Sequence, residues 1–84
     1  MKSFAVVFSY SDDTDVAVYL FDTLEEAVGY LKSSIQEEFR IATEENKWAS
    51  SFRISEDGRY GVLKNHYFGD TTEARVGFVY LPNG

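Results

Sequence analysis

The stretch that decides the fold spans residues 22 to 45 and reads DTLEEAVGYLKSSIQEEFRIATEE. Its apolar residues recur at the spacing of one helix face. Thr23 precedes them and Glu26 follows it three positions later, which is the pattern of a helix capping box. The stretch therefore predicts one amphipathic helix from about Leu24 to about Glu45. Its apolar stripe consists of Leu24, Ala27, Val28, Leu31, Ile35, Phe39 and Ala42.

Two apolar segments rich in β-branched and aromatic residues precede this helix. Residues 4–10 and 16–21 flank the sequence SDDTD, which is typical of a turn, so they predict a β-hairpin. Both faces of the first segment are apolar. Which face packs on the helix stays open at this point.

Three further strands are expected after the helix. Residues 51–55 alternate apolar and polar side chains, and Asp57-Gly58 is the dipeptide of a tight hairpin that would lead into residues 60–64. Residues 74–81 form the last apolar segment, after a mixed loop or strand end at residues 65–72. The pattern predicts a single ββαβββ domain of the α+β class over residues 1–84, with an antiparallel sheet of about five strands and the helix on one face. Strand orders 2-1-3-4-5 and 2-1-5-4-3 are both allowed.

Composition narrows the classes of protein to which the chain can belong. With 84 residues, of which 44% are hydrophobic and 17% aromatic, it can build one small core. The absence of cysteine excludes a disulfide scaffold, Cys-ligated zinc and thiol chemistry. The first apolar run is too short for a signal peptide or a membrane span, so we expect a cytoplasmic protein with no membrane contact.

No catalytic, metal or cofactor site is predicted, and the protein is not expected to be an enzyme. His66 is the single histidine, and no second histidine or cysteine completes a transition-metal site. Asp12, Asp13 and Asp15 are better interpreted as a solvated turn than as a calcium loop, because the glycine and the glutamate that an EF-hand requires are missing. The motifs for phosphate cradles and nucleophile elbows are also absent.

Negative charge is concentrated in the first half of the chain. The net charge is −6; residues 1–46 carry ten acids against three bases, and residues 47–84 carry four against five. Such a chain repels a nucleic-acid backbone, so direct nucleic-acid binding is not expected. Glu26, Glu37 and Glu44 project in nearly one direction on the outer helix face. They form either a solvated face or, with Asp12, Asp13 and Asp15, a surface for a protein partner that is basic. Because the predicted helix holds six acids and two bases, Glu37, Glu44 and Glu45 are expected to be unpaired.

Two positions leave alternatives open. Glu38 falls within the apolar arc of the helix, so either the helix overhangs the sheet there or a base meets the carboxylate; Arg53, Arg75 and Lys64 are the candidates. Three large aromatic residues fall in connections, where capping of the core edge is favoured over anchoring a partner. They are Trp48, Tyr67 and Phe68.

Segments 16–23 (VAVYLFDT), 37–46 (EEFRIATEEN) and 54–58 (ISEDG) resemble small acidic proteins of Firmicutes and their mobile elements. That group has no established activity, so the resemblance assigns no residue a role. Its mobile-element association favours a small phage-type inhibitor, such as an anti-CRISPR protein. We therefore expect an acidic protein-binding module that inhibits a nucleic-acid-binding protein; the alternative is a homo-oligomeric structural or assembly protein, for example a homodimer.

Overall fold

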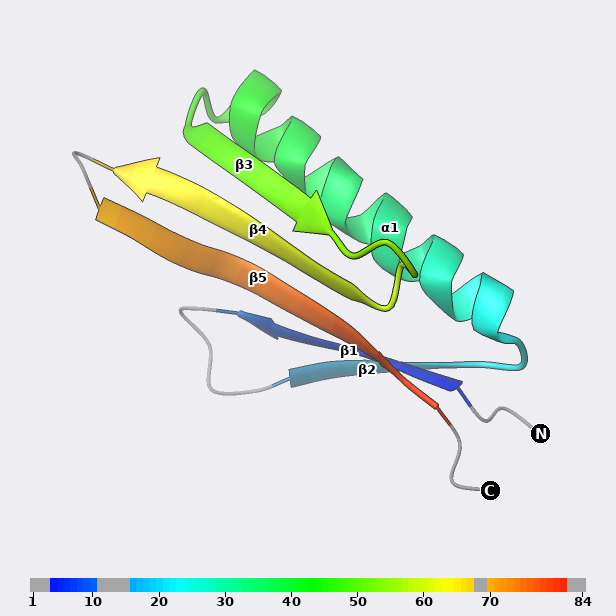
Figure 1. Ribbon diagram of the computed structural model, residues 1–84. Helices are drawn as coiled ribbons and strands as arrows, with labels where there is room; N and C mark the ends of the chain where they lie inside the picture. Colours follow the sequence, from blue (N-terminus) through cyan, green and yellow to red (C-terminus); the bar gives the residue numbers. More distant parts are fainter. Residues whose placement is uncertain (1–3, 11–15, 68–69, 82–84) are drawn as a thin grey trace.

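The computed structural model describes residues 4–10, 16–67 and 70–81, with the side chain of Tyr67 left aside. The elements follow the predicted ββαβββ order of an α+β domain (Figure 1). In chain order they are β1 (Phe4–Tyr10), β2 (Val16–Phe21), α1 (Leu24–Arg40), the π-helical turn η1 (Ile41–Glu45), β3 (Ala49–Ile54), β4 (Tyr60–Tyr67) and β5 (Asp70–Tyr80).

The five strands form one antiparallel sheet in the order β2-β1-β5-β4-β3. This is the second of the two orders that the sequence allowed, and it puts the last strand of the chain at the centre. The mixed segment before the last strand is also part of the sheet, because Asn65 pairs with Thr72 and His66 with Thr71. The final hairpin is therefore longer than the sequence pattern indicated.

Helix α1 begins at the predicted capping residue. The Thr23 hydroxyl accepts a hydrogen bond from the Glu26 backbone N–H at 3.1 Å and donates one to the Glu26 carboxylate at 3.0 Å. The helical path continues through η1, and it ends where Lys47 adopts a left-handed φ of 59°. The Trp48 N–H then bonds to the Ala42 carbonyl at 2.8 Å, which fixes the exit of the chain into β3.

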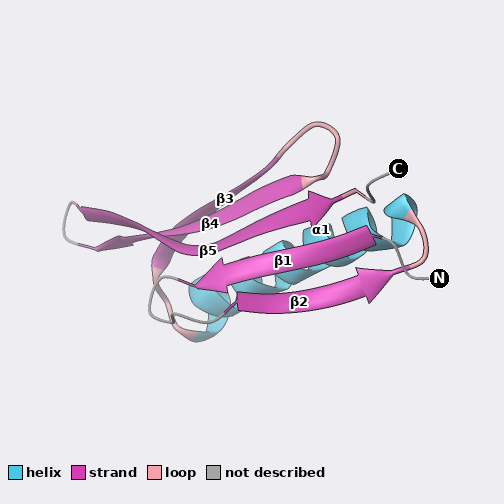
Figure 2. Cartoon of the chain, turned by 90° about the horizontal axis from the view of Figure 1, so that it is seen from below, coloured by secondary structure: helices cyan, strands magenta, loops and turns pink. Residues whose placement is uncertain are grey.

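The core lies between α1 and one face of the sheet. Val6 and Phe8 of β1 and Val79 of β5 meet Ala27, Leu31 and Ile35 of the helix, and all six are at most 5% exposed. The face of β1 that carries Phe4, Val6, Phe8 and Tyr10 is thus the one that packs on the helix, which answers the question that the sequence left open. In Figure 2 the strands lie in front of α1, which covers one face of the sheet only.

Candidate interaction surfaces

The uncovered face of the sheet is the first candidate surface, and we call it the open sheet face. Side chains alternate across a strand, and paired residues of adjacent strands point to the same side. Because Val6 and Phe8 point to the helix, Ala5 and Val7 point away from it, together with their register partners. The β2, β1 and β5 part of this face, called the apolar half, consists of Ala5, Val7, Val16, Val18, Leu20, Val76, Phe78 and Tyr80, with one polar residue, Ser9, between Val16 and Val76.

The apolar half is exposed although its residue types match those of the core. Val18 is 55% exposed and Leu20 53%, whereas Val6 and Leu31 are fully buried. On β5, Tyr80 is 56% exposed and Phe78 42%. A sheet face that stays in water is normally polar. The apolar half therefore has the composition of a surface that something covers.

A row of aromatic rings runs across the open sheet face from β4 to the end of β5. The Phe78 ring centroid lies 4.9 Å from that of Tyr60 and 6.3 Å from that of Tyr80, with the rings tilted in both pairs. Tilted and edge-on contacts are the favoured geometry of aromatic pairs. Rigid tyrosine and phenylalanine rings are also enriched among the residues that contribute most to protein–protein binding.

The β3 and β4 part of the open sheet face is polar. It surrounds a hollow of about 330 Å³ lined by Arg53, Ser55, Glu56, Tyr60, Val62, Lys64 and Glu73. Two cationic and two anionic side chains line it, so the charges of this polar half balance. In the part of the chain that the structure describes, no group of three or more histidine, cysteine or carboxylate residues could hold a metal ion.

The outward side of α1 and η1 is the second candidate, called here the acidic helix surface and comprising Glu26, Glu37 and Glu44. All three carboxylates are exposed, as the sequence pattern predicted. Glu26 is also part of the helix cap. The expected extension onto Asp12, Asp13 and Asp15 lies outside the described residues.

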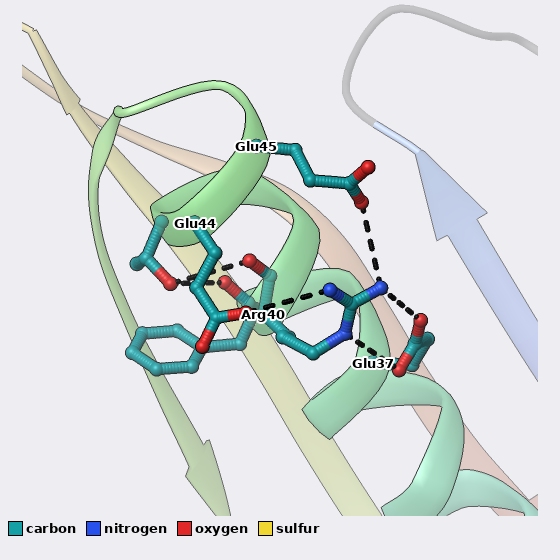
Figure 3. A network of polar contacts seen from close by, with 6 residues as sticks. Glu37, Arg40, Glu44 and Glu45 are labelled. Carbon is teal, nitrogen blue, oxygen red and sulfur yellow. Dashed lines mark hydrogen bonds and ion pairs between the residues drawn. The ribbon is translucent and has the colours of Figure 1, made fainter.

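Arg40 organises the acidic helix surface, and this corrects one expectation (Figure 3). Glu37, Glu44 and Glu45 were expected to be unpaired, but each of them contacts this guanidinium. Arg40 binds Glu37 through two nitrogens, at 2.7 and 3.1 Å, and reaches Glu44 and Glu45 at 3.4 Å. The hydrogen bonds from Arg40 lower the pKa of the Glu37 carboxyl. One arginine thus offsets part of the charge of three acids, which weakens the argument that this surface awaits a basic partner.

Glu38 is met by a base, as one of the two alternatives for it predicted. Its Oε1 lies 3.5 Å from Nη1 of Arg75, one of the three candidate bases. The Arg75 side chain is 14% exposed and its guanidinium lies over the Phe8 and Tyr10 rings, 4.7 and 4.6 Å from their centroids. Arg75 also donates to the Tyr10 hydroxyl. Glu38 therefore neutralises a largely buried cation at the edge of the core, which is a structural role.

A Ser–His–Thr chain crosses β3, β4 and β5, and the sequence reasoning missed it. His66 Nε2 lies 3.0 Å from Ser51 Oγ, and its Nδ1 lies 3.1 Å from Thr71 Oγ1. The order of groups is that of a nucleophile, a base and an orienting residue. All three residues are exposed, however, and none of them lines the hollows described here. Cross-strand pairing accounts for the contact, and only the strand register could have revealed it.

Of the three aromatic residues predicted in connections, the structure describes the side chain of Trp48 only. Trp48 lines a hollow of about 100 Å³ at the η1 end of the core, together with Ile41, Ala42 and Leu63. This position fits capping of the core edge. The Tyr67 side chain and Phe68 lie outside the described residues.

Comparison with known proteins gives no family: no protein-family model, curated protein or solved structure matches the chain. Among the described residues, no helix has the length and apolar character needed to cross a bilayer.

Proposed function

We propose that the protein is a non-enzymatic, cytoplasmic protein-binding module whose contact surface is the apolar half of the open sheet face. One observation carries the proposal: nine uncharged side chains from β2, β1 and β5, of which Ser9 is the only hydroxyl residue besides Tyr80, form one continuous face that α1 does not cover. Exposed apolar patches of this kind mark contact sites on folded proteins. The absence of cysteine fits a reducing compartment.

The charge of the molecule favours a protein over other classes of partner. A nucleic acid could stack its bases on Tyr60, Phe78 and Tyr80, but the neighbouring cations Arg53 and Lys64 are balanced by Glu56 and Glu73. The net charge of −6 repels both a phosphate backbone and an anionic membrane surface. Four of the seven residues that line the hollow beside the aromatic row are charged, whereas small-molecule sites are lined mostly by apolar and aromatic side chains.

Site-specific photo-crosslinking in the source cell tests the proposal. A photoreactive residue replaces Val18 on the apolar half in one variant, and Gln36 on the exposed side of α1 in a matched control. We expect protein adducts from position 18 and none above background from position 36. Adducts that form from position 36 alone would contradict the assignment of the contact surface.

The acidic helix surface is the second candidate, and one observation favours it. Between Leu24 and Glu45, six acids face two bases, and Arg40 holds three of those acids on one side of the helix. Such a surface is opposite in charge to the phosphate-binding groove of a nucleic-acid-binding protein, which is where a phage-type inhibitor would act, although its acids are spaced more widely than neighbouring phosphates. Electrostatic contacts of this kind act mainly on the association rate and are screened by salt.

Charge reversal separates this second candidate from the first. If the helix binds a basic partner, the combined change of Glu26, Glu37 and Glu44 to lysine slows association sharply, and added salt weakens the binding of the unchanged protein. The control reverses Glu56 and Glu73, which line the polar hollow on the other side of the sheet. Effects in proportion to the number of acids reversed, three against two, would show that only the total charge matters.

A further inference from the structure

We infer that the apolar half of the open sheet face is covered by a second copy of this chain, packed sheet against sheet across a two-fold axis. The inference rests on the proposed function, because it names the partner of that same surface. It is carried by the way in which large and small side chains are distributed over β1 and β5, and by where the acidic residues lie.

The two neighbouring strands at the centre of the patch complement each other in size. On the open sheet face β1 presents the small side chains Ala5 and Val7, whereas β5 presents Tyr80 and Phe78 directly beside them in register. A two-fold axis that runs along the strands between β1 and β5 exchanges the two strands and keeps their height. It therefore places Tyr80 and Phe78 of each copy over Ala5 and Val7 of the other. Large side chains over small ones are what interdigitating sheets require.

The same axis pairs the outer strands of the patch. It lays β2 of one copy over β4 of the other, so that Val18 and its neighbours on β2 approach the exposed edge of Tyr60. Strand β3, which lies outside β4, then falls at the rim of the interface, with Arg53 in water. An apolar centre with a charged, hydrated rim is the usual anatomy of a specific interface.

The area agrees with a modest dimer interface. Four strands about 4.8 Å apart and six residues long at about 3.3 Å each give a flat footprint of roughly 380 Å² per copy. Protruding side chains add to this footprint, so two copies bury on the order of 1,000 Å², which is the lower bound for a specific interface. The expected dimer is therefore one that dissociates on dilution.

Charge explains why a copy of so acidic a chain is accepted at this face and not elsewhere. Copies that met through their helices would bring two acidic helix surfaces together, each with Glu26, Glu37 and Glu44 exposed. Sheet-to-sheet packing puts the two helices on the outside, roughly 30 Å apart at about 10 Å per layer. That separation exceeds the Debye length of about 8 Å at physiological salt, so their repulsion is screened.

Sedimentation velocity over about a hundredfold range of protein concentration tests the inference, since dimer formation follows mass action. We expect the apparent mass to rise from the 9.6 kDa of one chain towards twice that value. Phe78→Lys, at the centre of the patch, should raise the dimer dissociation constant on the order of 30-fold or more, as loss of a central aromatic contact does. Gln36→Lys introduces the same side chain on α1 and should leave that constant unchanged.

An exchange of a large and a small side chain between positions 78 and 7 distinguishes a loss of the dimer contact from a loss of folding. Phe78→Val alone should weaken the dimer, and the combination of Phe78→Val with Val7→Phe should restore most of the affinity, because each large side chain again meets a small one across the axis. Circular dichroism of each variant monitors the fold. Restoration of affinity would be hard to explain by any surface other than this one.

The outcomes separate the inference from the proposed function. If the unchanged protein has the mass of one chain at every concentration, while position 18 still crosslinks to another protein, the second copy is wrong and the contact surface stands. A monomer that binds a single-stranded oligonucleotide through Phe78 would overturn both. A dimer that Phe78→Lys leaves intact would overturn the second copy at this face and would point to pairing through the uncharged edge strand β2, and the crosslinks from position 18 would still decide the contact surface.

Discussion

Both sides of the neighbouring strands β1 and β5 carry large apolar side chains, but the two sides differ in burial. Val6, Phe8 and Val79 point to α1 and are buried, whereas their neighbours Val7 and Phe78 and the next residue Tyr80 point away from it. The helix is one stripe wide and covers one face only. The apolar pattern of a strand thus shows which of its residues can be buried. Whether they are buried depends on whether another layer, here α1, covers that side of the sheet.

The largest expected effect comes from truncating one leucine on each side of the sheet. Leu31 is fully buried and Leu20 is 53% exposed. Leu31→Ala should lower the free energy of unfolding by about 2–5 kcal/mol, because it leaves a cavity in the core. In dilute protein Leu20→Ala should cost less than about 0.5 kcal/mol, as surface changes do. Urea melts compare the two.

Protein concentration sharpens this leucine pair. If the second copy covers Leu20, the cost of Leu20→Ala should grow as the concentration rises into the dimeric range, whereas the cost of Leu31→Ala should hardly change. A cost for Leu20→Ala that stays constant over that range would mean that nothing in the sample covers this residue.

The comparison extends to glycines. At Gly77, on the covered face, an added Cβ would lie 2.6 Å from Cε1 and 2.8 Å from Cδ1 of Phe8. Gly77→Ala should therefore cost about 1–3 kcal/mol by overpacking. At Gly29, on the exposed side of α1, an added Cβ would meet no atom within 4 Å beyond the adjoining helix backbone, so Gly29→Ala should stabilise the protein by up to about 1 kcal/mol through helix propensity. Thermal melts of the two variants should shift in opposite directions.

The helix cap tests what holds the covering layer in place. Thr23→Ala removes the acceptor for the Glu26 N–H and should cost about 1 kcal/mol of unfolding free energy. Thr23→Ser keeps the hydroxyl and serves as the control. An Ala variant as stable as the Ser variant would show that the cap contributes nothing to the covered face.

The smallest effect expected is a pH dependence in the β3–β4 turn, beside the polar half. The hydrogen bond from Ser55, at 2.7 Å, and that from the Arg59 N–H, at 3.1 Å, hold the pKa of the Asp57 carboxyl below its ordinary value. Because the pKa of this carboxyl is lower in the folded chain, its ionised form stabilises the fold at pH values above its ordinary pKa of 3.8. This contribution disappears as the pH falls through the folded-state pKa. Asp57→Asn should therefore lose less stability than the unchanged protein between pH 5 and about pH 2, as measured by melts across that range.

Local signals in the sequence were enough to predict the elements. Each of these elements depends on residues a few positions apart, so it can be predicted from one short segment. This holds for the helix start at Thr23, the apolar stripe through Leu31 and the turn at Asp57-Gly58. The strand order was not legible, because pairing β1 with β5 depends on contacts between residues about 70 positions apart. Without that order the sequence could not show that Phe78 and Tyr80 continue the apolar surface of β2 and β1.

The same limit applies to the candidate site. The sequence pointed to the acidic helix surface because spacing along one helix is easily read, and it identified Arg75 only as one of three bases for Glu38. It did not show that the single cation Arg40 contacts Glu37, Glu44 and Glu45, because these contacts depend on the side-chain rotamer of Arg40, which the spacing along the helix does not determine. The apolarity of both faces of residues 4–10 was the one signal that anticipated the open sheet face.

Isotope-filtered NMR on a mixed dimer tests the central claim most directly, namely that the open sheet face of one copy covers that of another. Labelled and unlabelled chains are mixed at a concentration that favours the dimer, and only contacts between copies are recorded. If the two sheets pack in this way, cross-peaks should connect the Val7 methyl groups to the Phe78 ring and the Val18 methyl groups to the Tyr60 ring of the other copy. Cross-peaks confined to side chains of α1, or none at all, would contradict it.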